Sequence, residues 1–440
     1  MNTFISWLKR HLCNYPTYAF LNYFWNFGSL IFLFFLLQII SGFYLAMYYV
    51  AYAQLASALI EWILREVYSG WFFKYVHSNG ASFIFLFIYM HILRNLYYGL
   101  FKDILLWWSG VILLILMILT AFFGYILPWG QMSFWAATVI TNFLTVIPEI
   151  GIKILEWFWC GFALNTWTLT RFYSFHYFCP FVIFGLIFLH IFLLHKKGSN
   201  NSLSLINFLQ MINFFPFFWI KDSFSFICSC FPFFFIVFYY PNYLGHPDNY
   251  IEANDLLTPL HIVPEWYFLF YYAMLRIIPH KTYGIILVAL FFILFFSLPM
   301  LNQGNFSFNQ NLYFYFVKKT QAKLYSLRDF WRVLHTLTLD KYDKILSGII
   351  SLFWRIANFN QLNIFNNGFN LKSLQFWTDF NPFHYLVIAF IILINLGGSL
   401  LTPHVITIGF LATVLLFICL GFIGGLTNFR LIWAKIKVQL

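Results

Sequence analysis

Charged side chains are scarce in this sequence. Asp, Glu, Lys and Arg make up only 9% of its 440 residues, whereas 62% are hydrophobic. Because water-soluble proteins carry about 25% charged residues, this chain lacks the polar side chains that would cover a surface in water. Its apolar runs reach the roughly 20 residues that a helix needs to cross a bilayer, without the alternation of barrel strands. The sequence therefore excludes a soluble enzyme and predicts an all-α integral membrane protein.

Cysteine motifs are also missing. The six cysteines form no CxxC and no CxxCH pattern, which gives no support for covalently attached c-type haem or for a zinc ribbon. We interpret them as small hydrophobic residues. The N-terminus has neither a cleavable signal peptide nor an Arg- and Ser-rich transit peptide, so we expect the chain to be inserted without processing.

Eight apolar runs predict eight transmembrane helices. They cover about residues 26–50, 71–98, 108–127, 169–194, 217–240, 283–300, 382–401 and 405–426. Shorter amphipathic segments at 51–70 and 131–160 are expected to lie on the membrane surface. With alternating spans, 19 of the 25 Lys and Arg residues but only 6 of the 14 acidic residues fall on the side that holds both termini. This asymmetry follows the positive-inside rule and explains the net charge of +11 without a nucleic-acid partner.

Two histidine pairs lie within the apolar runs. His77 and His91 are fourteen residues apart in the second span, and His176 and His190 have the same spacing in the fourth. In a helix this spacing is nearly four turns and about 21 Å, so each pair projects from one face at two depths. Both spans run in the same direction, which places His77 with His176 near the acidic side and His91 with His190 near the basic side. Two stacked bis-histidine sites are typical of two b-type haems, whereas zinc or copper would need further ligands that no neighbouring Cys or carboxylate supplies.

Glycines in the first and third spans repeat the same period. Gly28 and Gly42 are fourteen residues apart, and so are Gly110 and Gly124. Close packing between membrane helices is the usual explanation for any one such glycine. Four of them in the period of the histidines favour clearance for the edges of two flat porphyrin rings.

Three cationic residues lie close to these histidines in the sequence. Lys74 precedes His77 by three residues, Arg94 follows His91 by three, and Arg171 precedes His176 by five. A positive charge at these positions would pair with haem propionates. An ordinary role at the membrane interface is the alternative for each of them.

The sequence resembles cytochrome b of the mitochondrial and bacterial quinol–cytochrome c reductases over about residues 20–300 and 382–425. The resemblance is carried by NFGS…LQIISG, HSNGAS…HILRNLYYG, FGYILPWGQMSFWAATVITN, TLTRFYSFH…LH…LHKKGSNN, LGHPDNY, PEWYFLFYYAMLRIIP and TPHVITIG. It implies eight transmembrane helices, the first four forming a bundle around two stacked b haems. The expected divisions are a haem-binding bundle at 1–240, a quinol-site loop with PEWY and the sixth span at 241–300, a polar insertion on the basic side at 301–381, and two last spans with a basic tail at 382–440.

The resemblance implies a quinol-oxidising pocket near His77 and His176. Its residues would be Pro264, Glu265, Trp266 and Tyr267, with Tyr125, Pro128, Phe122 and Tyr272 as lining. Glu265 has a physical case of its own, because a quinol that loses electrons must also lose protons and a carboxylate at the membrane edge accepts one. The alternative is an acid that satisfies backbone N–H groups at the start of a helix.

A quinone-reducing pocket is implied near His91 and His190. Its residues would be His195, Asp222, Lys221 and Ser29, with Asn26 and Lys196 as weaker additions. A quinone that takes up two protons needs groups that titrate, and His, Asp and Lys serve that need. Without the resemblance, Lys221 and Asp222 would be interpreted as interface charges.

The implied function is that of the catalytic membrane subunit of ubiquinol–cytochrome c reductase, respiratory complex III. It would oxidise ubiquinol at one membrane face and reduce quinone at the other through two non-covalent b-type haems, in a Q cycle that translocates protons. Because the chain has no Cys/His ligand set for an iron–sulfur cluster, a Rieske-type iron–sulfur subunit and a c-type cytochrome must be partners. Further subunits, lipids and a homodimer are implied as well. The excess of Phe favours an AT-rich organelle genome, so we expect the mitochondrial inner membrane.

Two other functions fit parts of the sequence. A two-haem anchor for a soluble oxidoreductase would need neither the PEWY loop nor the surface segments after the third span. A transporter or channel with structural histidines would have helices broken around a midplane site and no haem.

Four features depart from the family pattern. Ala136 replaces a frequent Gly and should narrow the quinol pocket, so we expect poor binding of methoxyacrylate-type inhibitors. Lys74 stands where Arg is usual and keeps the charge without the bidentate geometry, and His246 replaces an acid. The basic insertion at 301–381 is expected to bind other subunits or anionic lipid.

Overall fold

The computed structural model describes residues 6, 9–201, 211–302, 382–400 and 402–439, with side chains up to 421 and at 423. The predicted insertion at 301–381 therefore lies outside the described residues, apart from 301–302, as does most of the predicted basic tail at the level of side chains. All described residues belong to one compact unit.

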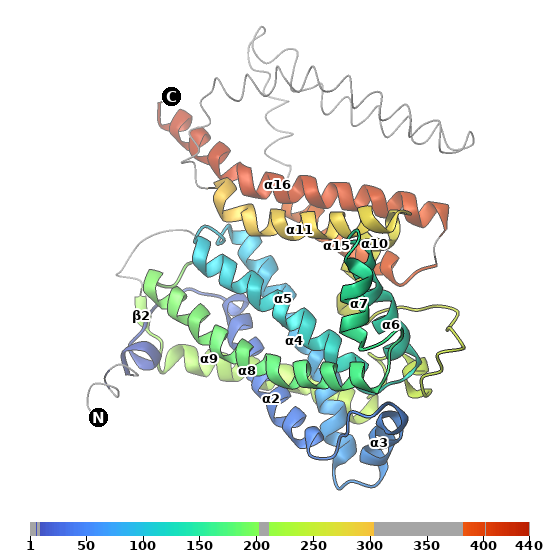
Figure 1. Ribbon diagram of the computed structural model, residues 1–440. Helices are drawn as coiled ribbons and strands as arrows, with labels where there is room; N and C mark the ends of the chain where they lie inside the picture. The colour runs from blue at the N-terminus through green and yellow to red at the C-terminus, as the bar shows by residue number, and fades with distance from the viewer. Residues whose placement is uncertain (1–5, 7–8, 202–210, 303–381, 401, 440) are drawn as a thin grey trace, which may run out of the picture. The chain divides into compact units, whose positions relative to one another are not determined.

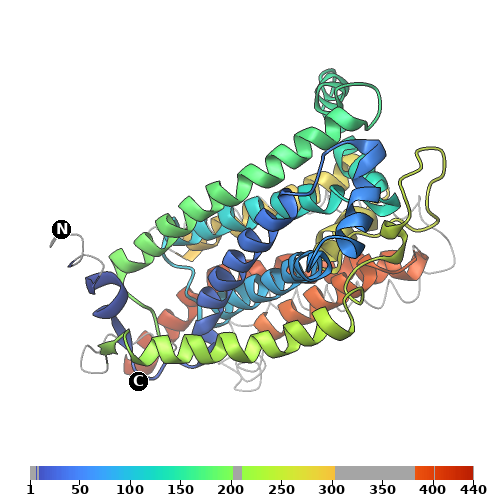
Figure 2. The same ribbon diagram turned by 90° about the horizontal axis from the view of Figure 1, so that it is seen from below.

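Long apolar helices dominate the described chain (Figures 1 and 2). They are α2 (Phe27–Ala46), α4 (Gly70–Tyr98), α5 (Ile104–Ile126), α8 (Thr166–Lys197), α9 (Phe217–Tyr239), α11 (Lys281–Asn302), α15 (Pro382–Gly397) and α16 (Pro403–Gln439). Seven of these eight are long and apolar enough to cross a membrane. The chain is therefore an integral membrane protein with predominantly helical structure.

Helix α15 is shorter than the sequence predicts. It has 16 residues, which is about 24 Å of helix against a hydrocarbon core of about 30 Å. The apolar pattern continues to Leu401, but the helix ends where Gly397 packs against the backbone of Leu269. Arg276 donates a hydrogen bond to the Gly397 carbonyl at 2.8 Å, so this end group is satisfied by a neighbour rather than by a further turn.

Short helices connect the long ones at the side where α4 begins and α5 ends. They are α3 (Ala53–Arg65), α6 (Gln131–Thr141), α7 (Gly151–Trp159) and α10 (Leu269–Ile277), with 3-10 turns at Asn142–Val146, Pro247–Tyr250 and Trp266–Phe268. A further 3-10 turn, Tyr23–Asn26, leads into α2 on the other side, where Trp25 packs against Tyr98 at the end of α4. In α3 the apolar residues Ala56 and Ile63 are buried, while Arg65 at the end of the helix is exposed. The segments at 51–70 and 131–160 form short helices, and their place on the membrane surface stays a prediction.

A small ribbon fastens the N-terminal segment. Strand β1 (Pro16–Tyr18) pairs antiparallel with β2 (Met211–Asn213), and Pro16 lies opposite Asn213. A single turn of π-helix, Lys9–Cys13, precedes β1. The ribbon ties the start of the chain to the segment that leads into α9.

The site lies between two helix pairs. Helix α2 packs against α4, and α5 packs against α8. Helix α4 is the most buried of the candidate spans, whereas only 6% of the apolar window of α8 is buried within the chain. Helices α10, α11, α15 and α16 form a second packed group. A capping box at Asn165 starts α8, and Gly99 in the left-handed region ends α4.

Candidate functional site

The first histidine pair meets across a cavity of about 310 Å³ between the two helix pairs. The ring centroids of His77 on α4 and His176 on α8 are 6.0 Å apart, with the ring planes nearly perpendicular at 87°. Both rings line the cavity. A metal–imidazole bond is about 2 Å long, so this separation accommodates one metal atom between two ring nitrogens.

Hydrogen bonds at Nδ1 determine which nitrogen of these two rings carries the proton. The Ser41 hydroxyl donates to the Leu37 carbonyl at 2.8 Å and is left to accept from Nδ1–H of His77 at 3.0 Å. Nδ1 of His176 donates to the Thr120 carbonyl at 2.8 Å. With the proton on Nδ1, Nε2 keeps the lone pair that a metal ion requires. Both rings therefore present Nε2 as the unprotonated nitrogen.

The second pair lies fourteen residues further along α4 and α8, about 21 Å of helix, where His91 and His190 are electrostatic neighbours. The Ser109 hydroxyl donates to the Leu106 carbonyl at 2.8 Å and accepts from Nδ1–H of His190 at 2.7 Å. This arrangement repeats the one at His77. Nε2 of His190 is thus left with its lone pair in the same way.

Arg94 is the hydrogen-bond partner of Nδ1 of His91. Its guanidinium lies 3.1 Å from that nitrogen, and because Arg only donates, Nδ1 must accept here and the proton moves to Nε2. The Nε atom of Arg94 is buried without a hydrogen-bond partner in the described structure. Ligation of iron by His91 requires Arg94 to release Nδ1, and an anionic group would give this buried cation a better partner.

Each of the four predicted glycines faces one histidine ring. A Cβ at Gly42 would lie 2.9 Å from Cε1 of His77, closer than real Cβ contacts, and a Cβ at Gly28 would lie 3.5 Å from Cε1 of His91. The remaining pairs are Gly110 with His190 and Gly124 with His176. The spacing predicts clearance for porphyrin edges, and the nearest atoms in the structure are those of the histidine rings.

The two other cations predicted near propionates have different surroundings. Lys74 lines the cavity and donates to the Tyr250 hydroxyl at 2.9 Å. The Arg171 guanidinium instead donates to the carbonyls of Trp157 and Phe158 at the end of α7. Lys74 is therefore placed to meet an anion in the cavity, while Arg171 is engaged in holding α7 against α8.

Glu265 lines the same cavity as His77 and His176. It stands at the N-cap of the turn Trp266–Phe268, yet its side chain makes no capping hydrogen bond, which argues against a purely structural acid. Burial raises the pKa of its carboxyl to about 7, although the Tyr125 hydroxyl and the Lys74 ammonium oppose that rise. A carboxyl with this pKa takes up and releases protons near neutral pH.

Tyr125 also lines this cavity. Its hydroxyl is buried without a well-aligned partner among the described residues, although it lies close enough to the Glu265 carboxylate to interact with it. Tyr267 and Pro128 complete this wall, and the Tyr267 ring stacks on Phe85 with centroids 4.4 Å apart. The cavity thus combines a titratable carboxyl, the Tyr125 hydroxyl beside it and apolar walls next to the histidine pair.

Other residues predicted for this pocket lie around it. The Tyr272 hydroxyl donates to the Ile262 carbonyl at 3.0 Å, and Phe122 packs on Phe172. Neither belongs to the residues that line the cavity. Pro264 precedes Glu265 in the chain, and Trp266 donates to Ser82 at 3.0 Å.

The structure also shows the surroundings of Ala136 and His246, two positions at which the sequence departs from the family pattern. Ala136 is buried in α6, and its effect on inhibitors stays a prediction. His246 caps the turn Pro247–Tyr250, because its Nδ1 accepts from the backbone N–H of Asp248 at 3.3 Å. In that turn Asn249 accepts hydrogen bonds from Ser133 at 2.7 and 2.9 Å, so His246 helps to hold the loop against α6.

Three residues predicted for the quinone-reducing pocket are brought together. Asp222 at the start of α9 lies within hydrogen-bonding reach of Ser29 on α2. Lys221 donates to the Leu21 carbonyl and lies 4.9 Å from the centre of the Tyr23 ring. Nearby, Asn26 donates to Ser225 at 2.7 Å.

His195 has its contacts on the N-terminal segment. Its Nδ1 lies 3.1 Å from Nδ1 of His11, and its ring stacks on Tyr15 with centroids 4.1 Å apart. Lys196 beside it is exposed. The described structure therefore assembles Ser29, Lys221 and Asp222 as one group and holds His195 in another.

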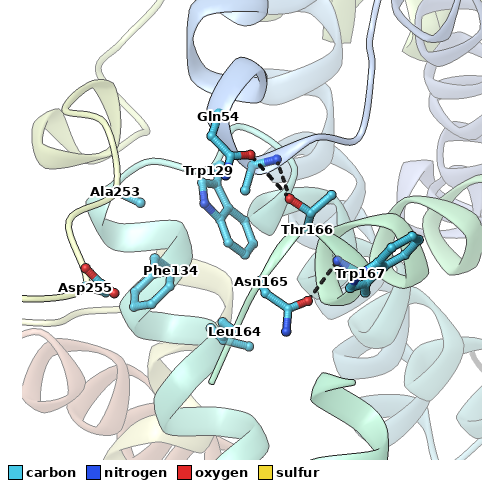
Figure 3. Close-up of a pocket in the computed structure, with 10 residues that line it drawn as sticks. Gln54, Trp129, Phe134, Leu164, Asn165, Thr166, Trp167, Ala253 and Asp255 are labelled. Atoms are coloured by element: carbon cyan, nitrogen blue, oxygen red, sulfur yellow. Dashed lines mark hydrogen bonds between the residues drawn. The ribbon is translucent and has the colours of Figure 1, made fainter. Parts of the chain in front are cut away.

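A second cavity of about 360 Å³ opens between the start of α3, the start of α6, the start of α8 and the loop after Tyr250 (Figure 3). Trp129 and Phe134 line it, and Thr166 at its rim accepts from the backbone N–H of Ala53 at 3.3 Å. None of the residues predicted for the haem or quinone sites lines this cavity.

Comparison with known proteins identifies the family. The model "Cytochrome b/b6/petB" matches residues 12–198, and "Cytochrome b(C-terminal)/b6/petD" matches residues 252–324. Cytochrome b of Phytophthora megasperma is 52% identical over 299 residues, which are 68% of this chain and 78% of that protein. The chain belongs to the cytochrome b family. Cytochrome b of Arabidopsis thaliana is 48% identical over 296 residues, 67% of this chain and 75% of the relative.

A solved structure shares the fold of this cytochrome b family member. A chain of "Hyperthermophilic respiratory Complex III" superposes with a TM-score of 0.74 and covers 96% of this chain and 95% of its own length, at 24% sequence identity. The fold predicted from the resemblance is thus confirmed at the level of the family, as a helical membrane protein of the cytochrome b type.

Membership of the cytochrome b family implies b-type haem, and the residues present fit that group. Three of the four histidines have Nδ1 bonded so that Nε2 is available to a metal. The fourth is paired with a buried guanidinium that has an unused donor. This donor set is pure imidazole, which suits six-coordinate haem iron in electron transfer.

The sequence-based prediction missed the serines that fix the histidine tautomers. Ser41 and Ser109 each directly precede one of the periodic glycines, Gly42 and Gly110. That repeated Ser-Gly pair is a signal from which the two residues were recognisable. The Thr120 carbonyl left no such signal, because any residue supplies a backbone oxygen.

Proposed function

We propose that this chain is the cytochrome b subunit of a ubiquinol–cytochrome c reductase, respiratory complex III. It would oxidise ubiquinol beside His77 and His176 and reduce quinone beside His91 and His190, coupling electron transfer to proton translocation in a Q cycle. The observation that carries the proposal is the cavity in which a facing histidine pair lies together with Glu265, whose pKa burial raises to about 7.

Two b-type haems would be held by the four histidines. His77 and His176 would ligate one iron and His91 and His190 the other, each through Nε2. Bound there, the haems supply one-electron transfer between the two faces of the membrane. The hydrogen bonds of Ser41, Ser109 and Thr120 support these roles because they orient the rings and raise their basicity.

At the quinol-oxidising site, Glu265 is proposed as the proton acceptor. Its raised pKa supports this role, since a base works best when its pKa lies near the working pH. The Tyr125 hydroxyl beside Glu265 is suited to bind a quinol oxygen, and Tyr267 with Pro128 forms an apolar wall that excludes water. Lys74 is proposed to pair with a propionate in the same cavity.

At the quinone-reducing site, the proposed proton donors are His195 and Asp222. The contact of Asp222 with Ser29 and the neighbouring Lys221 supports a polar site at the start of α9. Arg94, with its buried unused donor, is proposed to bind a propionate of the adjacent haem.

The proposed partners are a Rieske-type iron–sulfur subunit, a c-type cytochrome, further complex III subunits and lipids, within a homodimeric complex of the mitochondrial inner membrane. Support comes from the eukaryotic cytochromes b that resemble the chain and from the shared fold of a protein described as respiratory Complex III. The iron–sulfur and c-type centres would belong to those partners.

Quinol-driven reduction of cytochrome c by the purified complex tests this function. We expect activity in the parent, its loss in Glu265→Ala with both b-type bands retained, and its loss in His176→Ala together with one of the bands. A complex with b-type bands but no quinol–cytochrome c activity would instead support a haem-bearing anchor. A complex without any b-type band would refute both.

A further inference from the structure

A second histidine lies against the proposed quinone-reducing residue His195. His11 sits on the turn Lys9–Cys13, and His195 lies in the last turn of α8, 184 positions later in the chain. Their Nδ1 atoms are 3.1 Å apart, and their ring planes differ by only 7°. We propose that His11 is a positioning residue that supplies protons to His195 through this Nδ1–Nδ1 hydrogen bond. The inference rests on the proposed quinone-reducing site.

The contact is held by structure on both sides. The pairing of β1 with β2 is extended by backbone hydrogen bonds from Phe214 to Tyr15 at 2.9 Å and from Phe215 to Cys13 at 3.0 Å. Tyr15 is buried, stacks on the His195 ring and accepts from Ser199 at 3.3 Å. The turn that carries His11 is therefore fixed over the end of α8 by its own chain.

The distance between the two nitrogens sets the protonation of the pair. An N–H···N bond at 3.1 Å needs a donor on one side and a lone pair on the other. If His11 donates, Nδ1 of His195 accepts, and the proton of neutral His195 lies on Nε2. That nitrogen is then able to donate to a quinone oxygen. The pair thus presents His195 in the tautomer that a proton donor needs.

Proton transfer through the pair is balanced. The Nε2–H bond of His195 breaks as an O–H bond forms on the quinone, and the Nδ1–H proton of His11 moves to Nδ1 of His195. His195 stays neutral and exchanges tautomers, and His11 takes up a proton from water at Nε2 as it gives up the proton at Nδ1, so that neither ring becomes an imidazolate. His11 is only half-buried, so water has access to it. No electrons pass through the histidines, because the reduction itself belongs to the proposed function.

The charged groups around the pair are mostly cationic. Lys9 and Arg10 on the turn and Lys196 and Lys197 on α8 are exposed cations near the pair. Asp103 lies 3.4 Å from Lys197, and the phenol of Tyr15 stacks on the His195 ring. In the proposed relay His11 passes on one proton at a time.

The test compares His11→Asn with the parent complex in quinol–cytochrome c turnover at several pH values. Asn keeps a side chain able to hydrogen-bond His195 but does not carry a proton. We expect a kcat about tenfold lower, an unchanged KM for quinol, and a ratio of variant rate to parent rate that falls as pH rises, because protons then come from water directly. Lys9→Gln, on the same exposed turn, is the matched control and should behave as the parent.

The outcomes separate the two proposals. Parental kinetics in His11→Asn would overturn proton supply and leave only a structural contact. A lowered rate with the parental pH profile would overturn it as well. His11→Ala should recover turnover when imidazole is added, and failure to recover with intact b-type bands would count against the inference. If the parent complex itself lacks turnover, the proposed function fails instead.

Discussion

The clearance between Gly42 and His77 makes a sharp prediction. An added Cβ at Gly42 would lie 2.9 Å from Cε1 of His77, whereas carbon atoms in contact are about 3.5–4.0 Å apart. The imidazole must therefore move by about 0.6 Å or more, away from the position set by its bond to Ser41. Disturbing the orientation of a metal-binding histidine typically costs about 10–100-fold in affinity, or about 1.4–2.8 kcal/mol. Gly42→Ala should thus weaken haem binding at one of the two sites.

Gly28→Ala is the matched control. Its Cβ would meet Cε1 of His91 at 3.5 Å, an ordinary contact, so both haems should stay bound. Alanine is also the better helix former by about 0.5–1 kcal/mol, which excludes loss of helix stability as the cause in either variant. Reduced-minus-oxidised spectra of the purified complexes would show one weakened b-type band in Gly42→Ala and two full bands in Gly28→Ala. Two full bands in both variants, or equal losses in both, would refute the reasoning.

Three further predictions concern neighbouring residues. Glu265→Gln should lower quinol oxidation by about 10²–10⁴-fold. Because the proton-accepting carboxylate forms above its pKa of about 7, the parent rate should rise with pH through that value. A parent rate independent of pH would contradict the role of Glu265 as proton acceptor. Ser109→Ala removes the hydroxyl that accepts from His190 Nδ1–H and should weaken the binding of one haem about 10–100-fold, whereas Ser109→Thr keeps the hydroxyl. Equal haem contents in the two variants would contradict the claim that this hydrogen bond sets the tautomer of His190. Ala136→Gly should increase the sensitivity of quinol oxidation to methoxyacrylate-type inhibitors, measured by titration of turnover, and strong inhibition of the parent would contradict the predicted steric effect.

Periodicity carried most of what the sequence predicted. Histidines fourteen residues apart identify a helix face regardless of what packs on it, so the pairing of His77 with His176 followed from topology alone. The family motifs added Glu265 and Asp222, whose own neighbours in the chain are uninformative. The residues at which the spans end were less predictable, because they depend on contacts that a hydropathy pattern does not contain. One example is the hydrogen bond from Arg276 to the Gly397 carbonyl at the end of α15.

Contacts between distant segments were beyond prediction. His11 is a single histidine in a short N-terminal segment, and only the folded chain brings it to His195 through the β1–β2 ribbon. Arg171 shows the converse case. Its distance from His176 in sequence favours a propionate partner, but the backbone carbonyls at the end of α7 lie within its reach. A side chain as long as that of arginine reaches several possible partners, and the spacing of residues in the sequence does not show which of them it contacts.

The central claim is that four histidines of this chain hold two haems. The ratio of b-type haem to cytochrome b chain in the purified complex tests it directly. We predict two haems per chain in the parent and one in His176→Ala, which leaves His91 and His190 intact. One haem or none in the parent would contradict the claim.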